Sequence, residues 1–234
     1  MEEPAVLSPA QLRHISTYID ILQRWNARIN LTAIRDEEQI VTRHFGESLF
    51  AARHLFPRTP SVSSSVPPVS SVLKDFDSDF DFADHHRPTT NDRLTVADIG
   101  SGAGFPGIPI KLWAPEITLT LIESNHKKAT FLREVIRALT LTNINVFSGR
   151  AEQLTATTPV AFDRVTLRAV EHFADILPVA ATLVVPGGLL ALLIGSSQQH
   201  QAQSILTGIK WQPPLSVPEA ESRIMLVGSQ TLPR

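Results

Sequence analysis

The sequence contains no cysteine, although it is 234 residues long. This absence excludes disulfide bonds, metal sites built from thiolates and cysteine nucleophiles. Disulfides are rare in the cytoplasm, and a chain without any cysteine suits that compartment. We therefore expect a cytoplasmic protein.

Long hydrophobic runs and an excess of basic residues are also missing. No stretch of about eighteen apolar residues could cross a membrane, so we expect no membrane partner. The first residues, MEEPAVLSPAQ, lack the basic and apolar regions of a signal peptide. The formal net charge is −2, so RNA binding would have to depend on local basic patches rather than on a global basic field.

Composition divides the chain into three parts. Residues 1–56 have a helical pattern, residues 57–93 are rich in serine, proline and aspartate, and residues 94–234 alternate strands with helices. The composition of the middle part predicts a flexible insertion. Its alternating aspartates raise the question of calcium, but the glycine and the distal glutamate of an EF-hand loop are absent, and we expect no metal site.

The N-terminal part should be helical and packed on the rest of the chain. Ser8 can cap a helix that accepts Pro9 in its first turn. We expect a break at residues 26–32 and a second helical region at residues 37–56. Before the break, apolar residues recur at intervals of three and four, as on one buried helix face; they are Leu12, Ile15, Ile19, Leu22 and Trp25.

Arginine is frequent in and just after this helical part. The arginines can form a solvated helix face, or they can form a patch that binds RNA phosphates. The sequence leaves both interpretations open. The arginines concerned are Arg13, Arg24, Arg28, Arg35, Arg43, Arg53 and Arg58.

Residues 94–107, LTVADIGSGAGFPG, combine a strand with a glycine loop. The apolar and β-branched residues at the start suit a buried strand of a parallel sheet. Gly100, Gly102 and Gly104 then let the backbone turn sharply and approach a ligand with no Cβ in the way. An apolar pattern resumes at residues 108–113, so the segment predicts the first half of a nucleotide-binding βαβ unit.

Two acidic residues narrow the choice of ligand. Asp98 precedes the first glycine, and Glu123 ends the next predicted strand, where a carboxylate can accept hydrogen bonds from ribose hydroxyls. An acid at the mouth of the loop disfavours a pyrophosphate, whereas S-adenosyl-L-methionine has a ribose and a sulfonium but no phosphate. A dinucleotide stays open, because the glycines from Gly102 onward also fit the G-x-G-x-x-G pattern.

The remainder of the chain predicts an α/β fold with a doubly wound, mostly parallel sheet. The predicted strands are residues 94–99, 117–123, 144–148, 162–167, 189–194 and 223–228, with helices at residues 127–139 and 173–184. A turn at residues 186–188 and the two late strands predict an antiparallel addition at one edge. Ligands of such sheets bind beyond the carboxyl ends of the strands. Arg168 directly follows a strand, so it either faces the ligand or forms an ion pair with Glu171 or Asp163.

Together these motifs resemble those of the ribosomal RNA small subunit methyltransferase G family, also called glucose-inhibited division protein B. The resemblance covers nearly the whole chain except the insertion. Its most specific part is DIGSGAGFPGIP at residues 98–109. The other matching residues are Trp25-Asn26, Asn30-Leu31-Thr32, Arg43-His44, Glu123, Lys127-Lys128, Phe131-Leu132, Arg150-Ala151-Glu152, Arg168-Ala169 and Pro186-Gly187-Gly188.

The resemblance implies a Rossmann-like class I methyltransferase with an N-terminal helical extension. The family methylates N7 of one guanine in 16S ribosomal RNA with S-adenosyl-L-methionine as the cofactor. Its substrate would be 16S rRNA, the small ribosomal subunit or an assembly intermediate, and we expect a monomer. Position and resemblance together predict cofactor contacts at Asp98, Gly100, Gly102, Gly104, Phe105, Glu123, Ala151, Glu152 and Arg168, and contacts to the RNA or its target base at Asn30, Arg43, His44 and Arg168.

Such a reaction has modest chemical demands. Guanine N7 has a lone pair and carries no proton at neutral pH, so it can attack the sulfonium methyl in line without a general base. Holding the reacting atoms in line then supplies much of the rate. We therefore expect no single indispensable catalytic residue. A general base at His44 is the alternative.

Three positions depart from the family's pattern. Glu47 stands where the family usually has an aspartate, and Ile194 and Ile224 stand where it often has a lysine and a histidine, at positions that we expect to face the RNA. These losses keep open a non-catalytic RNA-binding protein that retains the fold. A nicotinamide-dependent oxidoreductase is the other alternative, although no catalytic Tyr/Lys or His pair is recognisable and the only tyrosine, Tyr18, lies in the N-terminal helix.

Overall fold

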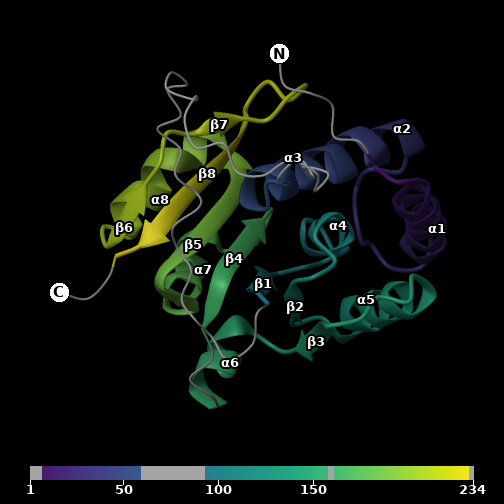
Figure 1. Cartoon of the computed structure of the whole chain (residues 1–234), viewed down its shortest axis with the longest axis horizontal. Coiled ribbons are helices and arrows are strands. Elements are labelled where there is room, and N and C mark those ends of the chain that lie inside the picture. The colour runs from purple at the N-terminus through teal and green to yellow at the C-terminus, as the bar shows by residue number, and fades with distance from the viewer. Residues whose placement is uncertain (1–6, 59–92, 158–160, 232–234) are drawn as a thin grey trace, which may run out of the picture.

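The computed structural model describes residues 7–58, 93–157 and 161–231 of the chain. Most of the predicted insertion, residues 59–92, lies outside the described residues. The described residues form three layers, with one sheet between two layers of helices (Figure 1).

Eight strands of the described residues form one mixed sheet in the order β3-β2-β1-β4-β5-β8-β6, and β7 pairs with β8 off this path. β3, β2, β1, β4 and β5 are parallel neighbours, whereas β8 is antiparallel to β5 and to the short β6 and β7. The doubly wound sheet and its antiparallel edge are therefore confirmed. The strands are β1 (Thr95–Ile99), β2 (Thr118–Glu123), β3 (Ile144–Ser148), β4 (Phe162–Arg168), β5 (Val184–Gly195), β6 (Ile209–Trp211), β7 (Leu215–Ser216) and β8 (Arg223–Gln230).

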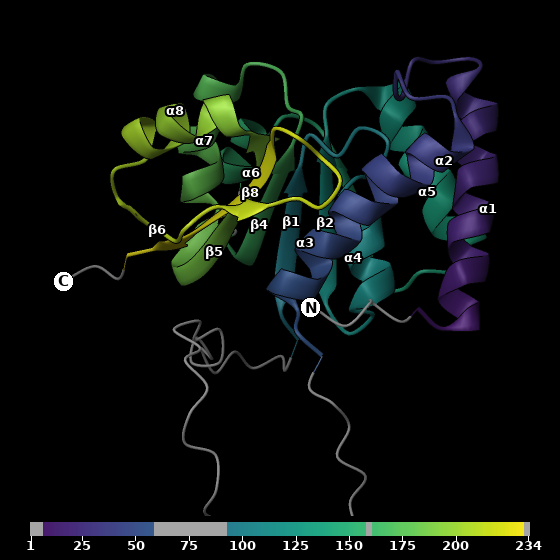
Figure 2. The same ribbon diagram turned by 90° about the horizontal axis from the view of Figure 1, so that it is seen from above.

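The helices cover both faces of the sheet, as Figure 2 shows. α1, α3, α4 and α5 pack on one hydrophobic core, and α6, α7 and α8 pack on the other. None of the described helices is long and apolar enough to cross a membrane. The helices are α1 (Pro9–Asn26), α2 (Glu37–Gln39), a π-helix (Ile40–Gly46), α3 (Glu47–Leu55), α4 (Gly107–Trp113), α5 (His126–Ala138), α6 (Ala151–Thr157), α7 (Phe173–Thr182), a 3-10 turn (Ser196–Gln198) and α8 (Gln199–Ile205).

Alternation along the strands explains why there are two cores. Successive side chains of a strand point to opposite faces of the sheet. In β1, Val96 packs with the N-terminal helices, whereas Ala97 and Ile99 pack in the core on the other face. Both faces of β1 are therefore buried, as expected for a central parallel strand.

The N-terminal extension is helical and packs on the α/β core. α1 begins with a capping box that Ser8 forms with Gln11, and it packs against α4 and α5. The predicted break after α1 is also confirmed. Asn26 holds the loop of this break in place, because its Oδ1 accepts hydrogen bonds from the amides of Leu31 (2.9 Å) and Thr32 (3.0 Å).

The second helical region contains a π-helix that its sequence did not predict. α2, the π-helix and α3 follow one another without a gap from residue 37 to residue 55. The π-helix inserts an extra residue into the helical ladder, and such insertions are frequent at functional sites. It contains Arg43 and His44, two of the predicted substrate residues.

Two predictions about the C-terminal third of the chain are corrected. The predicted turn at residues 186–188 does not begin a new strand, because β5 runs through it with an irregular register against β4 between Phe162 and Arg164. The prediction that Ile194 and Ile224 face the RNA is wrong as well. They are direct partners across β5 and β8, and they are 4% and 8% exposed in the core below α7 and α8. A charged side chain would be costly there, so the two isoleucines suit their positions and lend no support to a non-catalytic protein.

Candidate active site

The glycine loop lies at the carboxyl end of β1 and leads into α4. Gly100, Gly102 and Gly104 have φ angles of +67°, +55° and +86°, a region that other residues rarely adopt. The start of the loop is tied to β2, because the amides of Gly100 and Ser101 both donate to the carbonyl of Ile122, at 2.9 and 3.1 Å. The predicted turn is therefore present, and its shape requires glycine.

Asp98 lies beneath this loop rather than at its mouth. Its side chain is fully buried, and its carboxyl accepts hydrogen bonds from the Thr166 hydroxyl (2.9 Å) and from the Gly107 amide (3.2 Å). Burial raises the pKa of the Asp98 carboxyl to about 7, although the hydrogen bonds from Thr166 and Gly107 oppose this shift. Asp98 thus links β1 to β4 and to the start of α4. The expectation that Asp98 lies at the mouth of the loop is corrected, because its side chain is fully buried below the loop.

Glu123 joins the glycine loop to the loop after β2. One carboxylate oxygen accepts from the Gly102 amide at 2.8 Å, and the other accepts from the Asn125 amide at 2.7 Å. Each oxygen keeps a second lone pair. The carboxylate can therefore hold two loops together and still accept a hydrogen bond from a ribose hydroxyl.

The third loop lies next to Glu123. The Gly149 amide donates to the Glu123 carbonyl at 3.1 Å. Ala151 is buried and begins α6, whereas the neighbouring Glu152 is exposed. The structure thus brings three predicted cofactor loops together at the carboxyl ends of β1, β2 and β3.

Arg168 ends β4 and is held by the N-terminal helices. Its Nε and Nη2 donate to Glu47 Oε2 at 3.1 and 2.8 Å. Nη2 also donates to the Arg43 carbonyl at 2.8 Å, and Nη1 donates to His44 Nδ1 at 3.1 Å. An ion pair was one of the two expectations for Arg168, but its partner is Glu47 rather than Glu171 or Asp163.

The Glu47 carboxylate forms ion pairs with two arginines. Arg223 at the start of β8 donates to the same oxygen of Glu47 at 3.4 Å, so one carboxylate lies between two guanidinium groups. Its other oxygen, Oε1, is buried and has no hydrogen-bond partner among the described residues. Burial lowers the pKa of Arg168, and the charge of Glu47 opposes that shift.

His44 is a neutral histidine whose ring nitrogens are both engaged. Because a guanidinium can only donate, Nδ1 must accept from Arg168, and Nε2 therefore carries the hydrogen and donates to the Thr32 hydroxyl at 2.8 Å. Burial and the nearby charges of Arg168, Arg43 and Arg223 lower the pKa of His44 to about 3. Neither nitrogen offers a lone pair to a substrate, so this geometry does not favour His44 as a general base.

The predicted substrate residues differ in exposure. His44 is buried against Phe105, with ring centroids 4.7 Å apart and an interplanar angle of 21°. The side chain of Arg43 is exposed, although its carbonyl binds Arg168. Asn30 is exposed in the loop after α1, two residues before Thr32.

Sequence reasoning missed the role of Tyr18 and Phe45. Phe105 was predicted to contact the cofactor, but its side chain is buried against aromatic rings of the N-terminal helices. Tyr18 and Phe45 are buried apolar positions of α1 and the π-helix. Their only signal in the sequence was the helical spacing of apolar residues, which does not reveal the partner.

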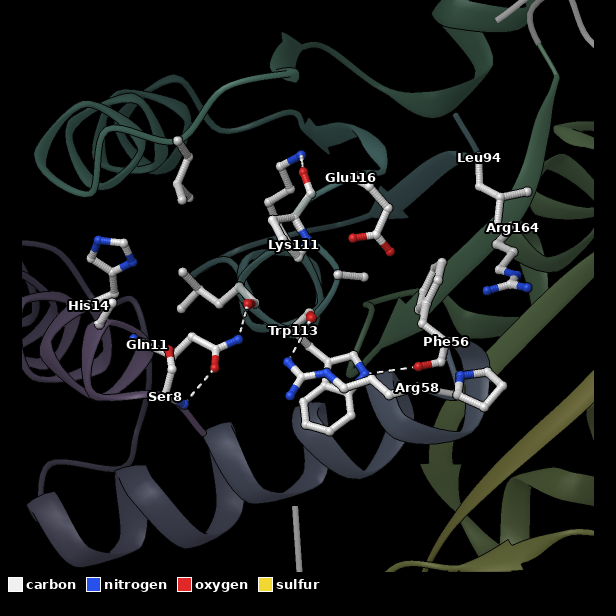
Figure 3. Close-up of a pocket in the computed structure, with 16 residues that line it drawn as sticks. Ser8, Gln11, His14, Phe56, Arg58, Leu94, Lys111, Trp113, Glu116 and Arg164 are labelled. Atoms are coloured by element: carbon white, nitrogen blue, oxygen red, sulfur yellow. Dashed lines mark hydrogen bonds between the residues drawn. The ribbon is translucent and has the colours of Figure 1, made fainter. Parts of the chain in front are cut away.

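A cavity of about 860 Å³ opens at the opposite end of the sheet, near the residues that precede β1 (Figure 3). Phe56 and Trp113 contribute aromatic rings, and the Arg58 guanidinium lies 3.6 Å from the centre of the Trp113 ring. In Figure 3 Ser8 and Gln11 line the side formed by α1. Ligands of open α/β sheets bind at the carboxyl ends of the strands, so this cavity is not the cofactor site.

Solved structures with similar folds are methyltransferases and an rRNA-processing protein. One is a predicted O-methyltransferase from Agrobacterium tumefaciens, with a TM-score of 0.51 and 20% identity over 60% of this chain and 75% of the other. Another is the fibrillarin pre-rRNA processing protein of Methanococcus jannaschii, with a TM-score of 0.51 and 18% identity over 60% of this chain and 68% of the other. At this identity the similarity concerns the fold, and it confirms the Rossmann-like class I prediction.

Relatives found by sequence have a much higher sequence identity to this chain than these solved structures have. The ribosomal RNA small subunit methyltransferase G of Xanthomonas euvesicatoria is 34% identical over 90% of this chain and 82% of its own length. That of Stenotrophomonas maltophilia is 35% identical over 92% of this chain and 82% of its own length. The family model described as rRNA small subunit methyltransferase G matches residues 11–62 and 80–218, and the unmatched residues 63–79 lie within the predicted insertion. The chain belongs to the rRNA small subunit methyltransferase G family.

Proposed function

We propose that this chain is an S-adenosyl-L-methionine-dependent enzyme that methylates N7 of a guanine in 16S rRNA. The observation that carries the proposal is the family match, because it includes both segments that build the site: the N-terminal helices with Glu47 and the core with the glycine loop. The substrate is 16S rRNA, free or within a small subunit or assembly intermediate. We expect the enzyme to act as a monomer in the cytoplasm.

The loops at the carboxyl edge suit S-adenosyl-L-methionine. Glu123 retains lone pairs for the ribose hydroxyls, and we expect the small side chain of Ala151, next to Glu152, to leave room for the adenine. The glycine loop can approach the methionine part closely, because its glycines have no Cβ. Arg168 has one N–H left after its four hydrogen bonds, which suits the cofactor carboxylate or the target base. When bound, the cofactor supplies an electrophilic methyl group on a sulfonium.

The protein's part in the reaction is then to hold guanine N7 in line with that methyl group and to exclude water. N7 has a lone pair and no proton to remove, so a neutral His44 with both nitrogens engaged is no obstacle. Proximity and orientation alone can supply several kcal/mol of the barrier. The target base must leave its stack to reach the site, so an irregular RNA segment is the expected target.

The exposed residues beside Arg168 are candidates for RNA binding. Arg43 holds Arg168 with its carbonyl while its side chain remains exposed. Its guanidinium is thus available to an RNA phosphate at the edge of the site, and Asn30 lies in a loop that supports His44 through Thr32. These contacts would position the RNA, whereas Arg168 would act closer to the base.

Transfer of a labelled methyl group from S-adenosyl-L-methionine to small ribosomal subunits that lack the modification tests the proposal. We expect label in the RNA of these subunits and none in subunits that already carry the modification. Cofactor binding without any transfer would favour the non-catalytic RNA-binding alternative. A thermal shift with a nicotinamide cofactor and none with S-adenosyl-L-methionine would favour the oxidoreductase.

A further inference from the structure

Tyr18 is the only tyrosine of the chain and lies on α1, yet its hydroxyl binds the glycine loop. The side chain is fully buried, and the hydroxyl donates a hydrogen bond to the carbonyl of Ala103. Burial, and then the charge of Asp98, raise the pKa of Tyr18 well above its usual value. The hydroxyl therefore remains a hydrogen-bond donor at any physiological pH.

This bond fixes one peptide group of the loop. The carbonyl of the Ala103–Gly104 peptide accepts from Tyr18, and its N–H donates to the Ser101 carbonyl at 2.6 Å. With both polar groups engaged, this peptide cannot rotate without breaking two hydrogen bonds in a buried place. The loop therefore keeps its shape before any ligand arrives.

The ring of Tyr18 holds Phe105, the residue that follows this peptide in the loop. It stacks on Phe105 with centroids 5.3 Å apart and an interplanar angle of 7°, and it meets the edge of Phe45 at 5.3 Å and 85°. Gly104 lies so close that an added Cβ would be 2.3 Å from the Tyr18 oxygen. The N-terminal helices and the glycine loop are thus fitted to one another at Tyr18.

We propose that Tyr18 is a positioning residue for the cofactor: its hydroxyl holds the Ala103–Gly104 peptide in the orientation that binds S-adenosyl-L-methionine. Tyr18 lies below the loop, so it acts through the backbone and not by touching the reacting atoms. The inference rests on the proposed function, because it assigns cofactor binding to this loop. It also gives the N-terminal helices a part in cofactor binding.

The test compares two substitutions in α1 that each remove one hydrogen bond. Tyr18→Phe keeps the ring and its stacking but removes the hydroxyl. Trp25→Phe is the control, because it removes the hydrogen bond from Trp25 Nε1 to Glu134 (3.0 Å), which joins α1 to α5. It also puts a smaller ring against Phe131, so it is the more disruptive change to α1 packing. Affinity for S-adenosyl-L-methionine is measured by calorimetry, and steady-state kinetics are measured on unmodified small subunits.

We expect Tyr18→Phe to raise the Kd and the KM for the cofactor about tenfold, the cost of about one buried hydrogen bond. The kcat at saturating cofactor should change little, because the interaction is equal in the ground and transition states. Trp25→Phe should leave the Kd within about twofold of the wild type, whatever its effect on Tm. An unchanged Kd in Tyr18→Phe, or an equal rise in both variants, would overturn the inference.

Hydrogen exchange of the unbound protein separates this inference from the proposed function. Faster exchange of the Gly104 amide in Tyr18→Phe than in Trp25→Phe supports a loop held by the hydroxyl, and equal exchange overturns it. A wild-type protein that binds no S-adenosyl-L-methionine contradicts the proposed function and, with it, the cofactor role of Tyr18.

Discussion

Glu47 Oε2 lies 2.8 Å from Nη2 of Arg168, which is 121 residues away in the chain, and the two side chains form a buried ion pair. The pair joins the first residue of α3 to the last residue of β4. Through Arg223 it also reaches the antiparallel edge of the sheet. Three segments that are distant in sequence thus meet at one carboxylate beside the glycine loop.

Replacing Glu47 by glutamine should destabilise the protein markedly. The change leaves the buried Arg168 without its counter-charge, and removing one partner of a buried pair costs about 3 kcal/mol or more. Glu47→Asp keeps the charge and restores the residue usual in the family, so its loss should be smaller. Urea unfolding measures both. The control is Glu221→Gln on an exposed turn, and equal stability of Glu47→Gln and this control would contradict the role of the pair.

His44 should make the protein less stable in acid. Its pKa in the folded protein is about 3, below the ordinary 6.5, so between these values the unfolded chain binds the proton and the folded protein does not. The stability that His44 contributes is therefore complete above pH 6.5 and is lost as the pH falls toward 3. His44→Gln should flatten this part of the curve of unfolding free energy against pH, and an unchanged slope would refute the prediction.

Asp98 should change the stability of the protein with pH in the direction opposite to that of His44. Its pKa in the folded protein is about 7, above the ordinary 3.8, so in this window the folded protein holds a proton that the unfolded chain releases. The contribution of Asp98 is therefore lost as the pH rises from about 4 to 7. Asp98→Asn cannot titrate, and its unfolding free energy should rise more steeply with pH over this window than that of the wild type. A parallel pair of curves would show that Asp98 is ionised in the fold.

Gly104→Ala should be costly, because the new Cβ has no room. It would lie 2.3 Å from the Tyr18 oxygen and 2.8 Å from Ile108 Cδ1, at a φ of +86°. Strain and overpacking together predict a loss of about 2 to 3 kcal/mol in unfolding free energy. Gly208→Ala is the matched control, since nothing lies within 4 Å of its added Cβ, and it should change stability by less than about 0.5 kcal/mol. Equal effects of the two changes would contradict the close fit between loop and helix.

Arg43→Gln tests the RNA side of the site. If the exposed guanidinium binds a phosphate, affinity for unmodified subunits should fall, and the slope of log K against log salt should become shallower by about one. Arg13→Gln is the control, because Arg13 is exposed near the start of α1, beside the residues that line the cavity at the other end of the sheet. Cofactor affinity should not change in either variant. A salt slope in Arg43→Gln that equals the slope of the wild type would exclude a phosphate contact at Arg43.

The sheet and the glycine loop could be predicted because their signals are local. β3 agrees with its predicted limits, and the predicted limits of β1, β2 and β4 differ by one residue from those observed. β1, β2 and β4 are largely buried, so their apolar runs are distinct. β3 lies at the end of the strand order and is only partly buried, and turns on either side set its limits. The short β6 and β7 and the helix α8 have no such pattern, and they form because β8 and α7 offer them a surface.

The site was harder to predict because its contacts join distant segments. The position of Arg168 after a strand was evident, but its partner Glu47 could not be chosen from the sequence. The π-helix that brings His44 to Phe105 departs from the helical period on which the prediction depended. The resemblance showed which family positions Ile194 and Ile224 occupy, but it could not show where their side chains point. Both side chains point into the core.

The most direct measurement is a map of the methyl group in rRNA after reaction with unmodified small subunits, made by nuclease digestion and mass spectrometry. We expect one 7-methylguanine in 16S rRNA and no other new modification. A methyl group on another atom or base would contradict direct attack by an unprotonated N7 at a site without a general base. RNA without any new methyl group, from a protein that binds both S-adenosyl-L-methionine and the subunit, would contradict the proposed enzyme itself.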